Sequence, residues 1–337
     1  LIVSNRPLAA AMLPPVATTP LDGGPVTASE PHNYRYFDLS GTALVGASRP
    51  VTVALGSQAA PGTWAIQGSF RGVTTTLGSG VALSVTSGTP QAIPVLTTAF
   101  DGLLTMDPTA DLAVAQTAGL YLREPLAVHN LTVSTGARLG HISFRDGISP
   151  TLTITASNIT IAAGGQLNVN ALGFPRAATF ACGNIGGGPG GGQSSQLIGA
   201  GAGHGGLGGG PNLAGFTYGA VDQPEQLGSG GSNGCGGGGS TLGPGGHGGG
   251  RIHLIVAGTL HVDGAILANG ESPGTNYSRP GGGGSGGSIW LEANALTGSG
   301  TIQARGGHSG PPNYTDGRGG GGGGGRIALH VTSNNFG

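Results

Sequence analysis

The residue types best suited to metal binding are scattered through this chain. It has nine histidines. Three of them lie in glycine-rich sequence: His204, His247 and His308. Three others lie on or near predicted strands: His253, His261 and His330. Zinc sites are marked by short, recurring Cys and His spacings, and no such spacing recurs here. The sequence therefore predicts surface histidines and indicates neither a metal site nor a cofactor site.

The acidic residues offer one candidate cluster, a loose trio of Asp101, Asp107 and Asp111. An enzyme that acts on polysaccharides needs paired carboxylates, or a base beside metal-binding acids, in one groove. The trio stands among Gly, Pro and Thr, which favours turns. The chain also contains no lysine, which excludes a P-loop lysine and a Schiff-base lysine. We predict that the protein is not an enzyme.

The amino-acid composition limits which kinds of binding partner and which cellular compartment suit the protein. The 337 residues include 74 glycines, only 8% are charged, and the net charge is −1. This balance carries no electrostatic signature for nucleic acid, and no apolar run is long enough to span a membrane. The sequence starts at Leu1 rather than at a methionine, as expected of a secreted chain whose signal peptide is removed. We expect an extracellular or cell-surface location.

Two kinds of covalent modification are candidates. The two cysteines, Cys182 and Cys235, both lie in glycine-rich sequence. A disulfide between them is expected in an oxidising compartment, but spacing cannot fix their geometry, so pairing and two free thiols both stay open. Four asparagines stand in N-glycosylation sequons. They are Asn130, Asn158, Asn276 and Asn313. Asn276 and Asn313 are the better candidates because both follow a proline-containing turn in equivalent segments.

The chain divides into three segments by pattern. Residues 1–32 are rich in proline and apolar at their start, which predicts an extended N-terminal arm. Residues 33–105 contain short β-branched and aromatic stretches about ten residues apart, which predicts a small β-sandwich. Residues 106–337 form a third, glycine-rich segment with internal repeats.

The repeats predict the fold of the third segment. "GGGRIHLIVAGTLHVDGAILANG" (248–270) and "GGSIWLEANALTGSGTIQARGG" (286–307) share apolar residues at alternate positions, and a third copy starts at Arg326. Two short strands hinged on glycine and stacked on neighbouring copies are typical of a parallel β-solenoid. The expected inward residues are Ile252, Leu254 and Val256, Ile289, Leu291 and Ala293, and Ile327, Leu329 and Val331. The expected outward residues are His253, Trp290 and Ala328.

The glycine runs are expected to leave the solenoid between matching strands, and the longest such excursion spans residues 174–250. Several runs space their non-glycine residues three apart, the period of a polyproline II helix. Such chains can pack side by side and bond to one another because no Cβ intervenes. We favour this polyglycine II-like bundle; the alternative is irregular loops with tight turns.

The repeat "GGGSGGSIWLEANALTGSGTIQARGG" followed by "GGGGGGRIAL" resembles the glycine-rich solenoid segments of large secreted bacterial surface and matrix proteins. The resemblance covers about residues 126–331. It implies a solenoid at the cell surface or in the extracellular matrix, and it implies no catalytic residues. Residues 1–105 fall outside it.

An apolar arm at one end and half a repeat at the other predict self-assembly. The third copy stops after its first strand, and an uncovered end of this kind exposes unpaired backbone. The sequence therefore predicts a structural subunit of an extracellular filament, in which the arm of one copy inserts into the next and the partners are further copies of the chain. The assembly residues would be Leu1, Ile2, Val3, Leu8, Met12, Leu13, Ile327, Leu329 and Val331. The alternatives are a glycan-binding adhesin, an ice-binding protein and a β-helical enzyme acting on polysaccharides.

Overall fold

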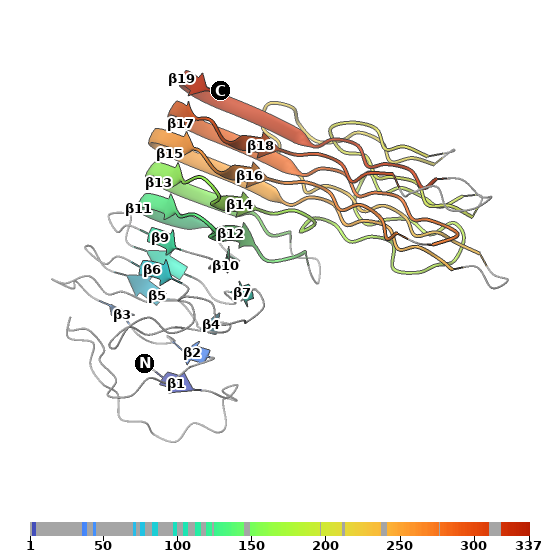
Figure 1. Ribbon diagram of the computed structural model, residues 1–337, viewed down its shortest axis with the longest axis horizontal. Helices are drawn as coiled ribbons and strands as arrows, with labels where there is room; N and C mark the ends of the chain where they lie inside the picture. The colour runs from blue at the N-terminus through green and yellow to red at the C-terminus, as the bar shows by residue number, and fades with distance from the viewer. Residues whose placement is uncertain are drawn as a thin grey trace.

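The computed structural model describes short strands within residues 1–122. It also describes residues 125–144, 149–195, 197–210, 213–236, 241–275, 277–309 and 318–337. Two of the predictions above lie entirely outside these residues, and a third, the set of assembly residues, lies partly outside them. The first two concern the Asp101, Asp107 and Asp111 trio, and the sequons at Asn276 and Asn313. In the described residues the fold is all-β, with two parallel sheets at one side and a body of glycine-rich segments extending from them (Figure 1).

The larger sheet, sheet 1, has the strand order β19-β17-β15-β13-β11-β9-β6, and every neighbouring pair is parallel. Its strands are β6 (Leu83–Thr86), β9 (Leu112–Ala115), β11 (Leu126–Val133), β13 (Leu152–Ile161), β15 (Arg251–Val262), β17 (Ser288–Gly298) and β19 (Arg326–Phe336). Because each strand pairs with the next strand of the same kind along the chain, sheet 1 stacks the repeats in sequence order.

The smaller sheet, sheet 2, takes one short strand from each repeat and is also parallel throughout. Its strands are β7 (Thr97–Ala99), β10 (Gly119–Leu122), β12 (Arg138–His141), β14 (Gln166–Asn168), β16 (Ala265–Leu267) and β18 (Thr301–Gln303). Two three-stranded sheets precede the main pair. They contain β1 (Ile2–Ser4), β2 (Tyr36–Asp38) and β4 (Phe70–Arg71), and β3 (Ala43–Leu44), β5 (Thr75–Leu77) and β8 (Leu104–Met106).

The predicted β-sandwich over residues 33–105 is wrong. β6 and β7 lie within this segment but are the outer strands of sheets 1 and 2, and the pairs β2–β4, β3–β5 and β5–β8 are parallel. Short β-branched stretches at regular spacing predict strands, but they do not distinguish a hairpin partner from a parallel one. Of the predicted N-terminal arm, Ile2–Ser4 forms β1, which pairs antiparallel with β2 of its own chain.

The core lies between the sheets and follows the alternation in the repeats. Ile252, Leu254, Ile289 and Leu291 are fully buried, and Val256 and Ala293 are nearly so, as predicted. Burying each large aliphatic side chain contributes roughly 1.5–3 kcal/mol. The prediction is wrong for the last strand, where Ile327 and Leu329 are exposed and Ala328 is buried. Ile327 and Leu329 are exposed because β19 is an edge strand, and no strand in the described part of the chain covers their side chains.

An asparagine pair accommodates an irregularity in the middle of sheet 1. The register between β13 and β15 shifts after Ala156. There the Asn158 side chain accepts a hydrogen bond from the Thr259 amide at 3.0 Å and donates one to Asn130 Oδ1 at 3.0 Å. A Cβ on Gly258 would lie 2.6 Å from Asn158 Oδ1, so glycine makes room for this contact. Side-chain amides thus replace the backbone bonds that a β-bulge interrupts.

The glycine-rich runs form a body of their own, hydrogen-bonded from run to run. The Gly246 amide donates to the Gly282 carbonyl at 2.9 Å, and the Gly283 amide donates to the Gly320 carbonyl at 2.8 Å. A further run, which contains Gly199, lies beside these, since the Gly320 amide donates to the Gly199 carbonyl at 2.9 Å. Buried amides require a partner, and here the partner is the backbone of another run. We call the described residues within 173–250, 268–287 and 303–325 the glycine body.

The predicted parallel β-solenoid with glycine-rich excursions is therefore wrong. The described residues form two parallel sheets, with five strands each from Gly119 onward, and the chain does not wind in a clear column of coils around one core. The physical reason lies in the glycine runs. A solenoid needs each repeat to return directly to the next coil, whereas here the backbone bonds between runs hold the long segments after β14, β16 and β18 outside the sheets.

Close approach makes glycine obligatory at aligned positions in the body. The pairs Arg251–Ser288 and Ser288–Arg326 are in register, which aligns the three runs that precede β15, β17 and β19. A Cβ on Gly249 would lie 2.5 Å from the Gly287 amide nitrogen, and one on Gly286 would lie 2.5 Å from that of Gly325. No side chain fits between backbones at this distance.

We therefore predict that Gly286→Ala destabilises the protein by at least about 1–3 kcal/mol, the usual cost of overpacking. Gly206→Ala is the matched control, because a Cβ there would lie 3.4 Å from the nearest backbone atom. Chemical denaturation of the full chain measures both. Equal stability of the two variants would contradict the close packing of the runs.

Candidate assembly surface

The end of the stacked repeats presents an open surface. β19 pairs along its length with β17, from Ser288↔Arg326 to Gly298↔Phe336, and it closes the strand order of sheet 1 (Figure 1). Its other edge carries no strand among the described residues. Ile327 is 43% exposed and Leu329 41% exposed, and Val331 is half-buried. We call β19 and the glycine run before it, residues 318–325, the end face. Exposed strand edges of this length are templates for pairing with another strand.

A strap crosses the starts of the last three long strands and holds them together. The strap, residues 213–227, makes one contact to each strand. Glu225 Oε1 lies 3.2 Å from Arg251 Nη2, Ser288 Oγ donates to the Gln226 carbonyl at 2.6 Å, and Arg326 Nε donates to the Tyr218 carbonyl at 3.0 Å. Because the three strand residues are in register, the strap fixes the alignment of the repeats at the junction with the glycine body.

The outer face of sheet 1 carries an aromatic and charged cluster. The His253 and Trp290 rings stack at 3.9 Å, and the His330 ring lies edge-on to Trp290 at 6.0 Å. His253 Nε2 lies 2.7 Å from Glu292 Oε1. Trp290 is only 8% exposed despite its outward position. The cluster joins strands β15, β17 and β19, so its main effect is cross-strand stabilisation.

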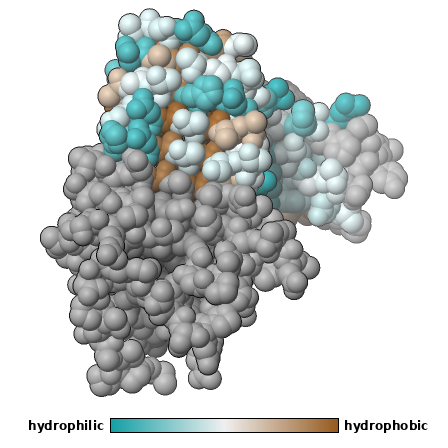
Figure 2. Space-filling model, turned by 60° about the vertical axis from the view of Figure 1, so that its left-hand side comes forward, coloured by the Kyte–Doolittle hydropathy of each residue, from teal (hydrophilic) through white to brown (hydrophobic). Residues whose placement is uncertain are grey.

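A shallow groove of about 370 Å³ runs beside this cluster across β13, β15, β17 and β19. Its lining includes Thr155, Ile255, Glu292 and His330, together with the largely buried Val256 and Ala293. Brown, apolar bands are visible on the face of the stacked strands in Figure 2. Glu292 is the groove's one carboxylate and is bonded to His253, so the groove offers no pair of carboxylates for acid–base chemistry.

Two histidines are buried, which the sequence did not predict. His141 Nδ1 lies 2.6 Å from the Ile142 carbonyl oxygen, and the Arg251 amide lies 3.1 Å from His141 Nε2. Because a carbonyl only accepts and an amide only donates, this pairing requires the neutral ring. Burial lowers the pKa of His141 to about 4. Its ring therefore serves as a neutral connector between sheet 2 and the start of β15.

His204 plays a similar part inside the glycine body, which makes the prediction of a surface histidine wrong for this residue. Its Nδ1 lies 2.8 Å from the Gly286 carbonyl oxygen, and its ring packs 4.6 Å from that of Tyr218. Burial lowers the pKa of His204 to about 4 and raises that of Tyr218 to about 12. The Tyr218 hydroxyl accepts from Ser229 Oγ at 2.8 Å and donates to the Leu227 carbonyl at 2.5 Å. His204 and Ser229 are fully buried and Tyr218 is half-buried, and the hydrogen bonds of this cluster join the strap to the glycine body.

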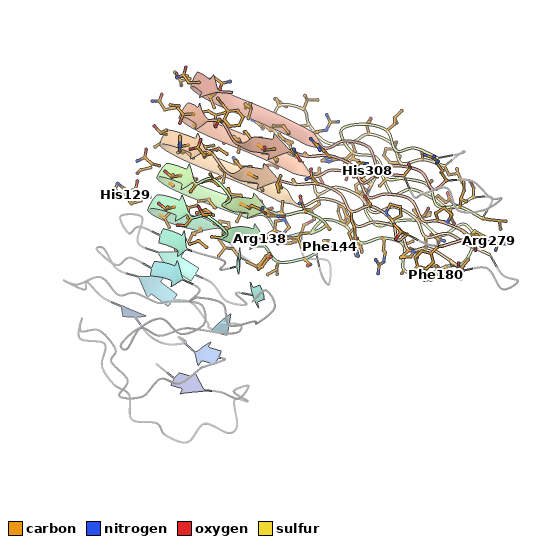
Figure 3. All side chains as sticks on the ribbon, viewed as in Figure 1. His129, Arg138, Phe144, Phe180, Arg279 and His308 are labelled. Atoms are coloured by element: carbon orange, nitrogen blue, oxygen red, sulfur yellow. A yellow bond between two sulfur atoms is a disulfide. The ribbon has the colours of Figure 1, made fainter. Side chains whose placement is uncertain are left out.

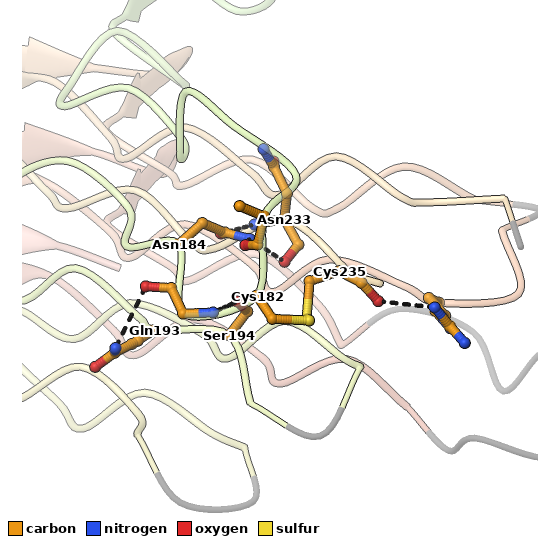
Figure 4. The surroundings of a disulfide bond; sticks show 9 residues. Cys182, Asn184, Gln193, Ser194, Asn233 and Cys235 are labelled. Atoms are coloured by element: carbon orange, nitrogen blue, oxygen red, sulfur yellow. Dashed lines mark hydrogen bonds between the residues drawn. A yellow bond between two sulfur atoms is a disulfide. The ribbon is translucent and has the colours of Figure 1, made fainter. Parts of the chain in front are cut away.

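A disulfide joins Cys182 to Cys235, whose Cα atoms are 4.8 Å apart (Figure 4). Asparagine side chains tie the same two segments together. Asn184 Oδ1 accepts from the Asn233 amide at 2.9 Å, and Asn184 Nδ2 donates to the Asn233 carbonyl at 3.2 Å. The cross-link lies in the glycine body away from the sheets. Figure 3 places Phe180 and Arg279 in the same distal part, while His129 lies at the opposite end, on sheet 1.

The two described sequons lie side by side on sheet 1. Asn130 and Asn158 are register partners, and Asn158 is exposed. The Asn158 amide nitrogen, the atom that a glycan would occupy, donates to Asn130 Oδ1. The structure brings these two sequons together, so a glycan on Asn158 would be attached at the contact that supports the bulge.

The predicted assembly residues do not meet in one place. Ile327, Leu329 and Val331 lie on β19, whereas Ile2 and Val3 lie on β1, opposite Asp38 and Phe37 of β2. Leu1, Leu8, Met12 and Leu13 lie outside the described residues. Sequence reasoning missed the strap and the buried histidines, because their partners are 26 to 110 residues away and follow no repeat.

Comparison of the chain with protein-family models, with curated proteins and with solved structures finds no match. Among the residues that the structure describes, no helix is long and apolar enough to cross a membrane. The same residues contain no group of three or more His, Cys, Asp or Glu side chains placed to hold a metal ion.

We predict that removing the disulfide destabilises the protein without unfolding the sheets. The Cys182–Cys235 link closes a loop of 53 residues, for which chain entropy gives about 4 kcal/mol. Denaturation of the Cys182→Ser/Cys235→Ser double variant, compared with the wild-type chain under non-reducing conditions, measures the loss. A difference of less than about 1 kcal/mol would show that the link contributes little.

We also predict that stability falls in mild acid. The folded-state pKa of His141 and of His204 is about 4, below the ordinary 6.5, so the unfolded chain binds these protons first. The stabilisation is complete above about pH 6.5 and is lost as the pH falls toward 4, by roughly 3 kcal/mol for each histidine. Unfolding free energies at pH 7.5, 6 and 5 measure the slope. The slope gives the number of protons taken up on unfolding, and His141→Gln should lower that number by about one. An unchanged slope would contradict the assignment of the lowered pKa to His141.

Proposed function

We propose that this chain is a structural subunit of an extracellular filament that grows by addition of further copies at the end face. The observation that carries the proposal is the open edge of β19. It is an 11-residue strand with one paired and one unpaired edge, and its two apolar side chains are about two-fifths exposed. Soluble proteins usually protect such an edge with charge, proline or a covering loop, and β19 is not protected in any of these ways within the described residues.

The internal packing supports a mechanical role. The glycine body buries backbone against backbone with hydrogen bonds between the runs, and it is locked by a disulfide. Disulfides persist in oxidising, extracellular compartments. The polar side chains that could do chemistry serve as connectors instead, as His141, His204 and Tyr218 do. A rigid, sparsely charged body of this kind suits a load-bearing element better than a catalyst.

The two binding alternatives have less support. A glycan-binding site normally offers an aromatic face to a sugar, but Trp290 beside the groove is almost buried and is stacked on His253. Ice binding would call for a regular threonine ladder. One outward row is Thr155, Ile255, Glu292 and His330, and in a second, Thr132, Thr160, His261 and Thr297, a histidine interrupts the threonines.

The proposal predicts that charge on the end face blocks assembly. Ile327→Lys/Leu329→Lys should keep the thermal stability within a few degrees, because both side chains are already exposed, but should abolish filaments. Ile255→Lys is the matched control, since Ile255 is 37% exposed on the face of β15 and away from the end. Negative-stain images and sedimentation velocity of the full chain measure the outcome. Filaments of unchanged length in the double variant would overturn the proposal.

A further inference from the structure

The groove on the outer face of sheet 1 lies where β15 carries an extra residue. Between its pairings with Ala293 and Ala295, β15 has two residues, at positions 257 and 258, where β17 has only Asn294. An extra residue of this kind is a β-bulge, which bends the strand and redirects the side chains beside it. Ala257 and Asn294 both line the groove. The groove therefore follows from the irregularity of the sheet and not from a flexible loop.

The groove carries one negative charge and no permanent positive charge. Glu292 is its only carboxylate, and neither arginine nor lysine is among the residues that line it. The other polar lining residues are neutral amides and hydroxyls and the His330 ring, which pairs with Glu292 in the register of β17 and β19. The charge of the groove is therefore complementary to a cation.

One oxygen of the Glu292 carboxylate is left for a ligand. Oε1 lies 2.7 Å from His253 Nε2, and Oε2 has no hydrogen-bond partner in the part of the chain that the structure describes. The Glu292 side chain is 37% exposed, so a donor can reach Oε2 from the groove. A guanidinium binds best to a carboxylate with both oxygens open, whereas an ammonium group acts as a single point charge. The geometry favours an ammonium group.

The lining beside Glu292 suits an aliphatic chain. Ile255 is the register partner of Glu292 on β15 and is 37% exposed. Ala156 and Ala257 extend this apolar lining. Lysine places its methylene stem along apolar surface of this kind while its ammonium group stays at a polar site. A metal ion fits less well, because no three His, Cys, Asp or Glu side chains converge among the described residues.

The depth of the groove indicates how the ammonium group is presented. Pockets for small molecules bury about 70–90% of their ligand, whereas this groove is shallow and open along one side. A side chain that projects from another protein gains further contacts on the surface around the groove, which a free amine does not. The shallow form therefore favours a protein-borne ammonium group.

We infer that this groove binds a lysine side chain presented by a partner protein. The lysine ammonium group would donate to Glu292 Oε2, and its stem would lie along Ile255. The 337 residues contain no lysine, so they cannot supply this side chain themselves. The groove opens on the face of sheet 1 and not at the unpaired edge of β19, so the inference does not rest on the proposed function.

Three blocked pentapeptides test the inference on the full chain. They differ only in the central residue, which is lysine, arginine or acetyl-lysine. Fluorescence anisotropy should show the strongest binding for the lysine peptide, weaker binding for the arginine peptide and none for the acetyl-lysine peptide. Methyl NMR should show that the lysine peptide shifts the signals of Ile255. Equal binding of either control peptide, or no binding of the lysine peptide at millimolar concentration, would overturn the inference.

A matched pair of variants tests the role of Glu292. Glu292→Gln should weaken binding of the lysine peptide by about tenfold, because it removes a charge-assisted hydrogen bond and keeps an oxygen for His253. Asp263→Asn is the control, since Asp263 is 40% exposed, lies 3.0 Å from His261 in the same kind of pair and is outside the groove. It should leave binding unchanged. An equal loss in both variants would mean a general effect of surface charge and would contradict a site at Glu292.

Ile255→Lys separates this inference from the proposed function. The new ammonium group would stand beside Glu292, the register partner of position 255, and should block the lysine peptide. Filament formation should stay as in the wild-type chain, because Ile255 is away from the end face. If the variant binds the lysine peptide as well as the wild-type chain does, the inference fails and the proposed function stands.

Discussion

Backbone hydrogen bonding between glycine runs, at distances that exclude a Cβ, is the constraint on which this structure depends. The runs before β15, β17 and β19 lie so close that a methyl group at Gly249 or Gly286 would overlap the amide of the next run. Hydrogen bonds spaced three residues apart hold the runs in alignment. The strands inherit this alignment, since the register between Arg251, Ser288 and Arg326 continues that of the glycines before them.

Polar side chains fill the places where that backbone network has gaps. Ser229 Oγ accepts from the Gly190 amide and Ser232 Oγ from the Ala200 amide, both deep in the glycine body. Asn233 bonds to the Ala177 and Thr179 carbonyls and to the Gly245 amide. Each is a short side chain that satisfies a buried backbone group. Polar side chains of the glycine body thus serve to satisfy buried backbone groups.

The end face belongs to the same network. The bonds that join each run to the next reach the last run. The apolar stripe of sheet 1 ends in the exposed side chains of Ile327 and Leu329. The open edge of β19 and the glycine run that precedes it are contiguous along the chain.

Several features were predictable from the sequence alone. The repeats align Ile252 with Ile289 and Leu254 with Leu291, and alternation fixes which face is buried; both predictions hold in sheet 1. The all-β character follows from the same pattern. Local periodicity determines these features, because each strand needs only a similar neighbour on either side.

Only the tertiary structure decided how the repeats are arranged in space and which residues from distant segments come into contact. It replaced the predicted solenoid and β-sandwich with two parallel sheets and a glycine body, and it brought Cys182 to Cys235 and His141 to Arg251. A glycine has no side chain to reveal its neighbours, so a glycine run in a sequence does not show which other run it bonds. That choice is made by backbone contacts between distant segments, which appear only when the chain is folded.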